Sequence, residues 1–139
     1  MAGSHVLQTR VIYKSALGSM IPRGILLKPR YNIAPTQMHP VVILEHDQRV
    51  LKLMKWGLVP FWAEDELIGY RMINVRAEGI ESKPVFRDPF KKRRCLVLAD
   101  GFYEWRKVDA ITKIPYFIRL KSGELFASSA TISTDNRSD

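Results

Sequence analysis

Residues 94–105 read Arg-Cys-Leu-Val-Leu-Ala-Asp-Gly-Phe-Tyr-Glu-Trp, and this stretch gives the strongest indication of the fold. Arg94–Ala99 is a compact apolar run, which predicts a buried strand, and Asp100–Gly101 ends it with turn-forming residues. Cys95 lies inside that run and is expected in the core. Beyond the break, Glu104 lies between two bulky aromatic residues. A carboxylate there is partly desolvated and suits general acid–base chemistry; the alternative is a cross-strand ion pair.

Further short strand signals lie on both sides of this stretch. Val41–Leu44 and Val50–Met54 flank a polar turn, which indicates a hairpin. Ile114–Leu120 alternates in polarity, and we expect it to pair with Leu125–Ala130 across a turn. Two stretches have a helical character: Val6–Leu17 and Ala63–Ile68. The sequence therefore predicts a β-rich α+β fold with a few short helices.

The size and composition bound the class of protein. The chain has 139 residues, of which 46% are hydrophobic, so we expect one domain, 1–139, with a real core. No apolar run has the roughly 20 residues that a membrane-spanning helix needs, and no secretory signal is recognisable. A single cysteine excludes an internal disulfide. We expect a cytoplasmic or nucleoid protein, or a nuclear one in a eukaryote. Residues 1–5 contain Gly-Ser-His, and two interpretations stay open: a native N-terminus or an expression-tag remnant.

The charge points to a polyanionic partner. Lys and Arg number 22 against 14 Asp and Glu, which gives a net charge of +8. Residues 1–44 contain no acidic residue. A second basic stretch, 83–94, carries Phe86 and Phe90 among its cations. Aromatic residues among cations suit base stacking beside phosphate contacts, and the alternative is a solvated loop whose phenylalanines pack inward.

Two other segments combine polar and aromatic residues in patterns that suit a binding site. In Ile73–Glu78 an amide, a guanidinium and a carboxylate share one face if the segment is extended; the alternative is a solvated edge. Trp56–Trp62 is rich in aromatic and turn-forming residues. We expect one tryptophan to pack in the core and the other to offer a stacking surface for a base. His39 and His46 form no zinc pattern, and no metal or cofactor is expected.

Four segments together resemble the SRAP family, the SOS response-associated peptidases or abasic-site processing proteins. The segments stand in the family's order: Tyr31–Gln37, Trp56–Trp62, Asn74–Glu78 and Arg94–Trp105. The resemblance implies a β-rich fold whose sheets curve into a barrel-like core. It also implies a monomeric protein of the DNA damage response whose positive groove binds single-stranded DNA with an abasic site. The residues that match the family's DNA-binding positions are Asn32, Pro35, Thr36, Trp56, Trp62 and Arg76.

The resemblance also implies covalent chemistry. In the family, methionine removal exposes a cysteine whose amine and thiol capture the abasic aldehyde as a thiazolidine. Asn74 matches the residue that holds the reacting N-terminus. Glu104 matches the residue that handles protons at the amine and in methionine removal, an activity of hydrolase or lyase type.

This sequence departs from the pattern at two places. Ala2 stands where the family has its nucleophilic cysteine, and no histidine follows His46 to assist ring opening. Three hypotheses remain: a member that crosslinks abasic DNA, a single-strand binding module without chemistry, and a peptidase acting on other chains.

Overall fold

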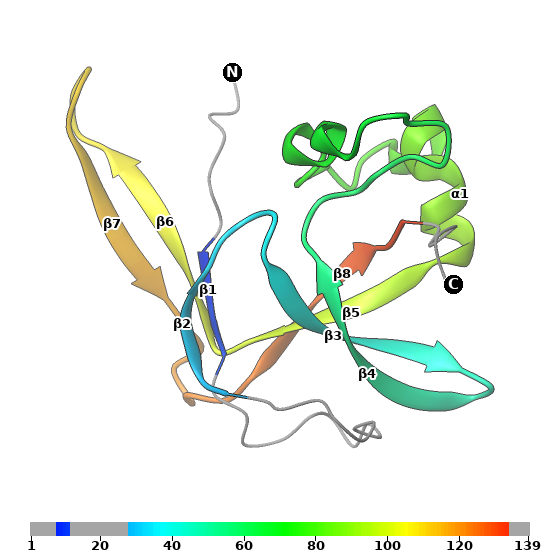
Figure 1. The fold of residues 1–139 in the computed structure, drawn as a ribbon. Coiled ribbons are helices and arrows are strands. Elements are labelled where there is room, and N and C mark those ends of the chain that lie inside the picture. Colours follow the sequence, from blue (N-terminus) through cyan, green and yellow to red (C-terminus); the bar gives the residue numbers. More distant parts are fainter. Residues whose placement is uncertain (1–7, 12–27, 134–139) are drawn as a thin grey trace.

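The computed structural model describes residues 8–11 and 28–133, which form two antiparallel sheets of four strands each (Figure 1). The first sheet has the order β2-β1-β6-β7, and the second has the order β4-β3-β5-β8. The strands of the first sheet are β1 (Gln8–Val11), β2 (Arg30–Ile33), β6 (Gly101–Lys107) and β7 (Lys113–Ile118). Those of the second are β3 (Met38–Glu45), β4 (Gln48–Lys55), β5 (Arg94–Ala99) and β8 (Phe126–Thr131).

The break predicted at Asp100–Gly101 is the point where the chain passes from the second sheet to the first. β5 ends at Ala99 and β6 begins at Gly101, so one residue separates strands of different sheets. Gly101 is required by close packing, because a Cβ atom there would overlap the ring of Phe117 on the neighbouring β7. The predicted strand and its end are confirmed, although Gly101 already belongs to β6.

The predicted hairpin is also confirmed and forms the centre of the second sheet. β3 pairs with β4 along its whole length, from Met38 opposite Lys55 to Glu45 opposite Gln48. The two connecting residues, His46 and Asp47, both have positive φ, at 48° and 62°. Two positive φ angles define the type I′ turn, whose twist matches that of the flanking strands.

The core lies mainly on the second sheet. Most buried apolar side chains come from β3, β4 and β5: Val41, Val42, Ile43, Val50, Leu51, Cys95, Leu98 and Ala99. Cys95 packs with Val41, Ile43 and Val50, so its predicted place in the core is confirmed. Burial raises the pKa of its thiol to about 11, which keeps the sulfur protonated and unreactive at neutral pH.

The predicted pairing of Ile114–Leu120 with Leu125–Ala130 is wrong. β7 pairs with β6, and β8 pairs with β5 in the other sheet. The short β6–β7 connection explains the difference. The Asp109 carboxylate accepts hydrogen bonds from the amides of Ile111 and Thr112, at 2.9 and 2.7 Å, and so forms a tight local turn.

The helical predictions need three corrections. Within Val6–Leu17, residues 8–11 form β1, because pairing with β6 and β2 overrides a weakly periodic pattern; the rest lies outside the described residues. The expected helix at Ala63–Ile68 is the 3₁₀ helix η1, Glu66–Arg71, which starts later because Asp65 caps it. The sequence did not predict η2 (Ile80–Ser82) or α1 (Pro84–Lys92). Pro89 obscured α1, since proline inside a helix removes a hydrogen bond.

The fold class is confirmed as β-rich with curved antiparallel sheets and a few short helices. The described strands form two separate sheets rather than one closed barrel, because the chain changes sheet at Asp100. The short helices lie together on one side of the molecule, away from the β6–β7 hairpin (Figure 1). Within residues 8–11 and 28–133, no helix has the length and apolar character to cross a membrane.

Candidate nucleic-acid interface

Trp56, at the end of β4, joins three of the motif segments through hydrogen bonds. Its carbonyl accepts from the amide of Thr36 at 2.8 Å, and its amide donates to the carbonyl of Gln37 at 3.0 Å. Its indole Nε1–H donates to the carbonyl of Ile73 at 3.1 Å. The Tyr31–Gln37, Trp56–Trp62 and 73–78 segments, far apart in the sequence, therefore meet at one residue, through its backbone and its indole.

Trp56 serves as a packed support rather than as a free stacking surface. Its ring is half-buried and meets the buried imidazole of His39 edge-on, with centroids 6.2 Å apart. Burial lowers the pKa of His39, with a smaller contribution from the nearby Arg30 charge, although the contact with the Pro40 carbonyl acts in the opposite direction. The structure thus confirms the expectation that one tryptophan packs inward.

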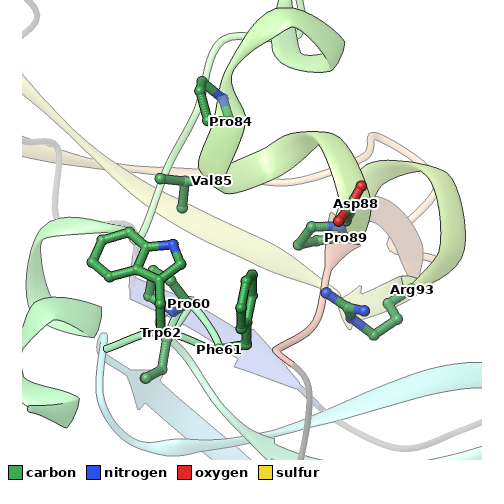
Figure 2. Close-up of a pocket in the computed structure, with 9 residues that line it drawn as sticks. Pro60, Phe61, Trp62, Pro84, Val85, Asp88, Pro89 and Arg93 are labelled. Atoms are coloured by element: carbon green, nitrogen blue, oxygen red, sulfur yellow. The ribbon is translucent and has the colours of Figure 1, made fainter. Parts of the chain in front are cut away.

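Trp62 is the exposed member of the pair. Its side chain is 55% exposed and that of the adjacent Phe61 is 71% exposed. Both rings line a cleft against α1, where Val85, Pro89 and Arg93 form the opposite wall (Figure 2). Phe61 stands between the Trp62 indole and the Arg93 guanidinium, and Asp88 also lines the cleft (Figure 2). Exposed aromatic rings with a cation in the same cleft suit base stacking beside a phosphate contact.

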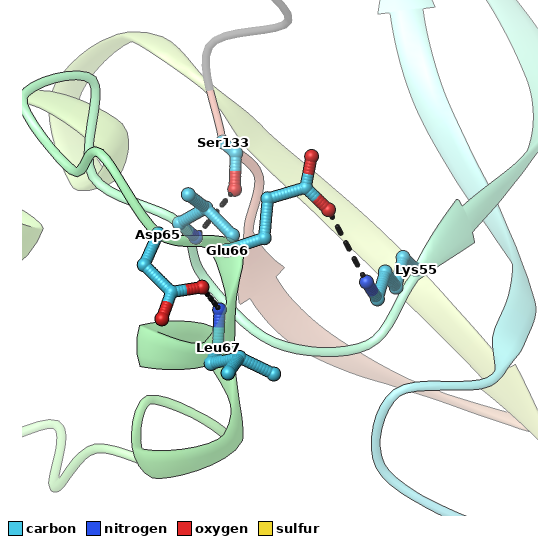
Figure 3. Close-up of polar contacts among 6 residues, drawn as sticks. Lys55, Asp65, Glu66, Leu67 and Ser133 are labelled. Atoms are coloured by element: carbon cyan, nitrogen blue, oxygen red, sulfur yellow. Dashed lines mark hydrogen bonds and ion pairs between the residues drawn. The ribbon is translucent and has the colours of Figure 1, made fainter.

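Contacts at both ends hold the segment that carries Trp62 in place (Figure 3). The Val59 amide donates to the Ser133 hydroxyl at 2.8 Å, which joins the segment to the end of β8. The Glu66 carboxylate forms an ion pair with Lys55 of β4 at 3.4 Å. The Asp65 side chain accepts from the Leu67 amide at 2.8 Å and so starts η1.

Asn74 and Arg76 follow Ile73, whose carbonyl accepts from the Trp56 indole, in a segment without regular structure. Both side chains are exposed, and Val75 between them is half-buried. The extended strand considered for Ile73–Glu78 does not form, although the outward direction of the polar groups is retained. Leu58 N–H, in the Trp56–Trp62 segment, donates to the Met72 carbonyl at 3.0 Å. This hydrogen bond fixes the start of the 73–78 segment.

Glu104 comes from the first sheet. It is half-buried on β6, opposite Tyr116 of β7. The β6–β7 hairpin and the short helices lie on different sides of the molecule in Figure 1. A joint role of Glu104 and Asn74 stays a prediction. Ala2 lies outside the described residues. The described part of the chain contains no group of three His, Cys, Asp or Glu side chains placed to hold a metal ion.

The second basic stretch forms α1 and its flanks rather than a loop. Arg87, Lys91 and Lys92 are exposed on the helix. Phe86 and Phe90 are half-buried, and the Arg94 guanidinium lies over the Phe90 ring at 6.0 Å. The inward packing of the two phenylalanines is therefore the better description. Arg87, Lys91 and Lys92 do not line the Trp62 cleft, to which this stretch contributes Pro84, Val85, Asp88, Pro89 and Arg93.

Sequence reasoning missed Arg30 and Gln37, which determine how the Pro35–Thr36 turn is held. The Gln37 Oε1 atom accepts from Arg30 Nη2 at 2.7 Å and from the Ala34 amide at 3.3 Å. Arg30 Nη1 also donates to the Met38 carbonyl at 2.6 Å. The sequence signal that could have indicated this role is the glutamine at the end of the Pro-containing turn 34–37. The three DNA-binding candidates of this region differ in exposure: Asn32 is exposed, whereas Pro35 and Thr36 are half-buried.

Comparison with known proteins supports one family. The family model described as "SOS response associated peptidase (SRAP)" matches residues 7–138. The abasic site processing protein YoaM of Bacillus subtilis is 46% identical over 117 residues, which cover 84% of this chain and 51% of YoaM. The abasic site processing protein HMCES of Mus musculus is 34% identical over 125 residues, covering 78% of this chain and 35% of HMCES.

Solved structures show the same fold. A crystal structure of a Bacteroides thetaiotaomicron protein is 33% identical, with a TM-score of 0.60 over 71% of this chain and 44% of its own. A Bordetella bronchiseptica protein reaches a TM-score of 0.68 at 15% identity, over 89% of this chain and 61% of its own. The chain spans about half the length of YoaM. The match to the family model over residues 7–138, together with these relatives, shows that the chain belongs to the SOS response associated peptidase (SRAP) family.

Proposed function

We propose that this chain binds single-stranded DNA at abasic sites through the surface formed by the Thr36 turn, Trp62 and Arg76. The observation that carries the proposal is the junction at Trp56, where hydrogen bonds join the three segments that bear these residues. The similarity to YoaM and HMCES, both abasic site processing proteins, and the net charge of +8 support it.

Each residue type makes a different contribution to binding. Trp62, with its exposed ring, offers a stacking surface, and base stacking on an aromatic side chain contributes about 1–3 kcal/mol. Arg76 is exposed and neutralises a phosphate, which contributes about −0.7 to the slope of log affinity against log salt. Arg93, directly after α1, brings a cation to the cleft that Trp62 lines.

A salt titration with an abasic oligonucleotide tests the binding proposal. Arg76→Ala is expected to weaken binding and to reduce the salt slope by about 0.7, whereas Trp62→Ala weakens binding with little change of slope. Arg49→Ala on β4 and Lys121→Ala in the turn after β7, both exposed cations outside the segments that form the proposed surface, are the matched controls. Binding without salt dependence, or equal losses in the controls, contradicts this placement of the interface.

We further propose that the free amine of Ala2 condenses with the abasic aldehyde once Met1 has been removed. The amine nitrogen bonds to the aldehyde carbon, the carbinolamine loses water, and a Schiff base remains. Glu104 takes the amine proton and returns it to the leaving hydroxyl. The register supports this role, because Gln8 of β1 pairs with Tyr103, and Ala2 is at most about 20 Å of extended chain from Gln8.

Borohydride trapping tests the covalent step. A Schiff base hydrolyses readily, so we expect little adduct on denaturing gels without borohydride and a stable one with it. Ala2→Cys supplies a thiol that closes a thiazolidine, so its adduct survives without borohydride, and Glu104→Gln slows its formation. A strong borohydride-independent adduct of the unmodified chain contradicts the proposal. Retained binding without any trapping identifies a binding module without chemistry, the second candidate, which Ala2 favours.

The same proposal includes the setting in which the chain acts. Residues 1–139 form one domain, and the chain acts as a monomer on single-stranded DNA. It does so in the nucleoid or nucleus, as part of the DNA damage response. Sedimentation of the chain alone and with an oligonucleotide measures the stoichiometry. A single species with the mass of one chain per binding site is expected.

A further inference from the structure

The turn that carries Pro35 and Thr36 holds a residue in an unfavourable conformation. Gln37 N–H donates to the Ala34 carbonyl at 3.2 Å, which closes a four-residue turn with Pro35 and Thr36 in its centre. Thr36 has φ of 74°, at a position where turns with positive φ usually place glycine or asparagine. A β-branched residue rarely adopts this region, so surrounding contacts must hold it there.

The Gln37 side chain adds a restraint to this turn beyond its backbone hydrogen bonds. Gln37 Oε1 accepts from the Ala34 amide, at the start of the turn, and from Arg30 Nη2 on β2. Arg30 is fixed in turn by the hydrogen bond from Nη1 to the Met38 carbonyl. The glutamine side chain therefore joins the first residue of the turn to a neighbouring strand.

The turn is also joined to the aromatic part of the interface. Thr36 N–H donates to the Trp56 carbonyl, and Trp56 N–H donates to the Gln37 carbonyl. The Trp56 indole continues the connection to Ile73, next to Asn74 and Arg76. A change in the turn conformation would thus displace both Thr36 and the support of the Arg76 segment.

We propose that Arg30 and Gln37 are positioning residues that hold the strained Thr36 turn against Trp56, and that this fixed geometry sets the affinity for single-stranded DNA. The inference rests on the proposed function, because it concerns the same surface. Neither residue needs to contact the DNA. Without Gln37 the positive φ of Thr36 loses its side-chain restraint, and the turn adopts its binding geometry only part of the time.

The size of the expected effect follows from the population of the competent turn. If the turn keeps its geometry about a tenth of the time in Gln37→Leu, the apparent Kd for an abasic oligonucleotide rises roughly tenfold. Gln37→Glu retains an oxygen for both donors and should bind within about threefold of the unmodified chain, a rescue that a general loss of packing would not give. Gln48→Leu, at another exposed glutamine on β4, is the matched control and should leave Kd unchanged.

A double variant tests whether the effect acts through Thr36. Thr36→Gly accepts positive φ without strain. Adding Gln37→Leu to Thr36→Gly should therefore raise Kd much less than adding it to the unmodified chain. Equal increases in the two backgrounds overturn the inference, because the glutamine would then act by another route.

Hydrogen exchange of the Trp56 indole N–H separates this inference from the proposed function, since it requires no DNA. Trp56→Phe assigns the signal. The exchange should accelerate in Gln37→Leu, return towards normal in Gln37→Glu and remain unchanged in Gln48→Leu. Unchanged exchange in Gln37→Leu overturns the inference even if the chain binds DNA. Accelerated exchange supports the positioning role of Gln37. Absence of DNA binding by the unmodified chain refutes the proposed function and, with it, the effect on affinity, but not the positioning role.

Discussion

The central strands of the second sheet and the β6–β7 hairpin have similar apolar sequences but opposite environments. In β3, five consecutive residues from His39 to Ile43 are buried. In β7, all six residues from Lys113 to Ile118 are exposed. The hairpin extends away from the body of the molecule (Figure 1). Apolar character alone therefore does not decide burial in this chain; the presence of a second layer does.

The difference extends to the hydrogen-bonding edges. β3 has β4 on one side and β5 on the other, so its backbone is paired at both edges. β7 ends its sheet and pairs only with β6 among the described strands. Its exposed side chains include Ile114, Tyr116 and Phe117. The two regions should therefore respond very differently to the same substitution.

The largest expected difference is between two leucine truncations. Leu98 of β5 is 0% exposed, and Leu120, just beyond β7, is 45% exposed. Leu98→Ala leaves a cavity and should lower the free energy of unfolding by about 2–5 kcal/mol. Leu120→Ala should change it by less than about 0.5 kcal/mol, as a surface substitution. Urea denaturation measures both.

An equal loss in the two variants would show that Leu120 is covered in solution. A loss at Leu98 below about 1 kcal/mol would instead show that the second sheet is loosely packed, because tight cores do not absorb such a cavity. Ser129 opposite Leu96 and Ala127 opposite Leu98 are small, so β8 has little side-chain volume with which to fill the space.

The next effect is at the passage between the sheets. Gly101→Ala places a methyl group against the Phe117 ring, and overpacking of this kind costs about 1–3 kcal/mol. Phe117→Ala in the same chain removes the obstructing ring, so the double variant should recover part of the loss. Gly123→Ala adds a methyl group with nothing within 4 Å of it, at a φ of 73°. Its loss of stability therefore measures backbone strain without a clash, whereas the loss in Gly101→Ala measures the clash. A double variant no better than Gly101→Ala contradicts this explanation.

The same contrast explains what could be predicted from sequence. The β3–β4 hairpin and the break after β5 depend on local signals: an apolar run, a polar turn and an Asp-Gly pair. The partners of β7 and β8 depend on which sheet each strand joins, which no local pattern encodes. In the site, the sequence predicted that one tryptophan packs inward and the other is exposed, but not which of the two. The roles of Arg30 and Gln37 were not, because they arise from contacts across a turn and between strands.

A smaller effect is expected from Cys95 in the second sheet at alkaline pH. Burial raises its pKa from 9.0 to about 11, so the unfolded chain loses the thiol proton first as the pH rises. Stability from this group is complete below about pH 9 and falls towards pH 11, by roughly 1 kcal/mol at pH 10. Cys95→Ala should lose this part of the pH dependence. Thiol labelling at pH 8 should be slow in the native chain and fast in urea, and rapid native labelling contradicts burial.

The smallest effect connects the buried sheet with the interface. His39 is 3% exposed on β3 and supports Trp56 edge-on, and its ring nitrogen Nδ1 lies 2.9 Å from the Pro40 carbonyl, which fits an N–H donor there. Burial lowers its pKa below the ordinary value of about 6.5, so the unfolded chain binds the proton first as the pH falls. Stability from this group is therefore complete above about pH 6.5 and falls as the pH drops towards the lower, folded-state pKa.

Denaturation between pH 7 and 5 measures this loss, and comparison of two histidine variants assigns it. His39→Gln keeps an N–H donor for the Pro40 carbonyl but has no proton to gain, so its stability should depend less on pH in this window. His46→Gln, in the exposed β3–β4 turn, should retain the full dependence. If the two variants behave alike, the loss belongs to other groups. A dependence that disappears only in His39→Gln shows that acid acts on the buried sheet directly beneath Trp56, while the exposed turn of the same hairpin is indifferent to it.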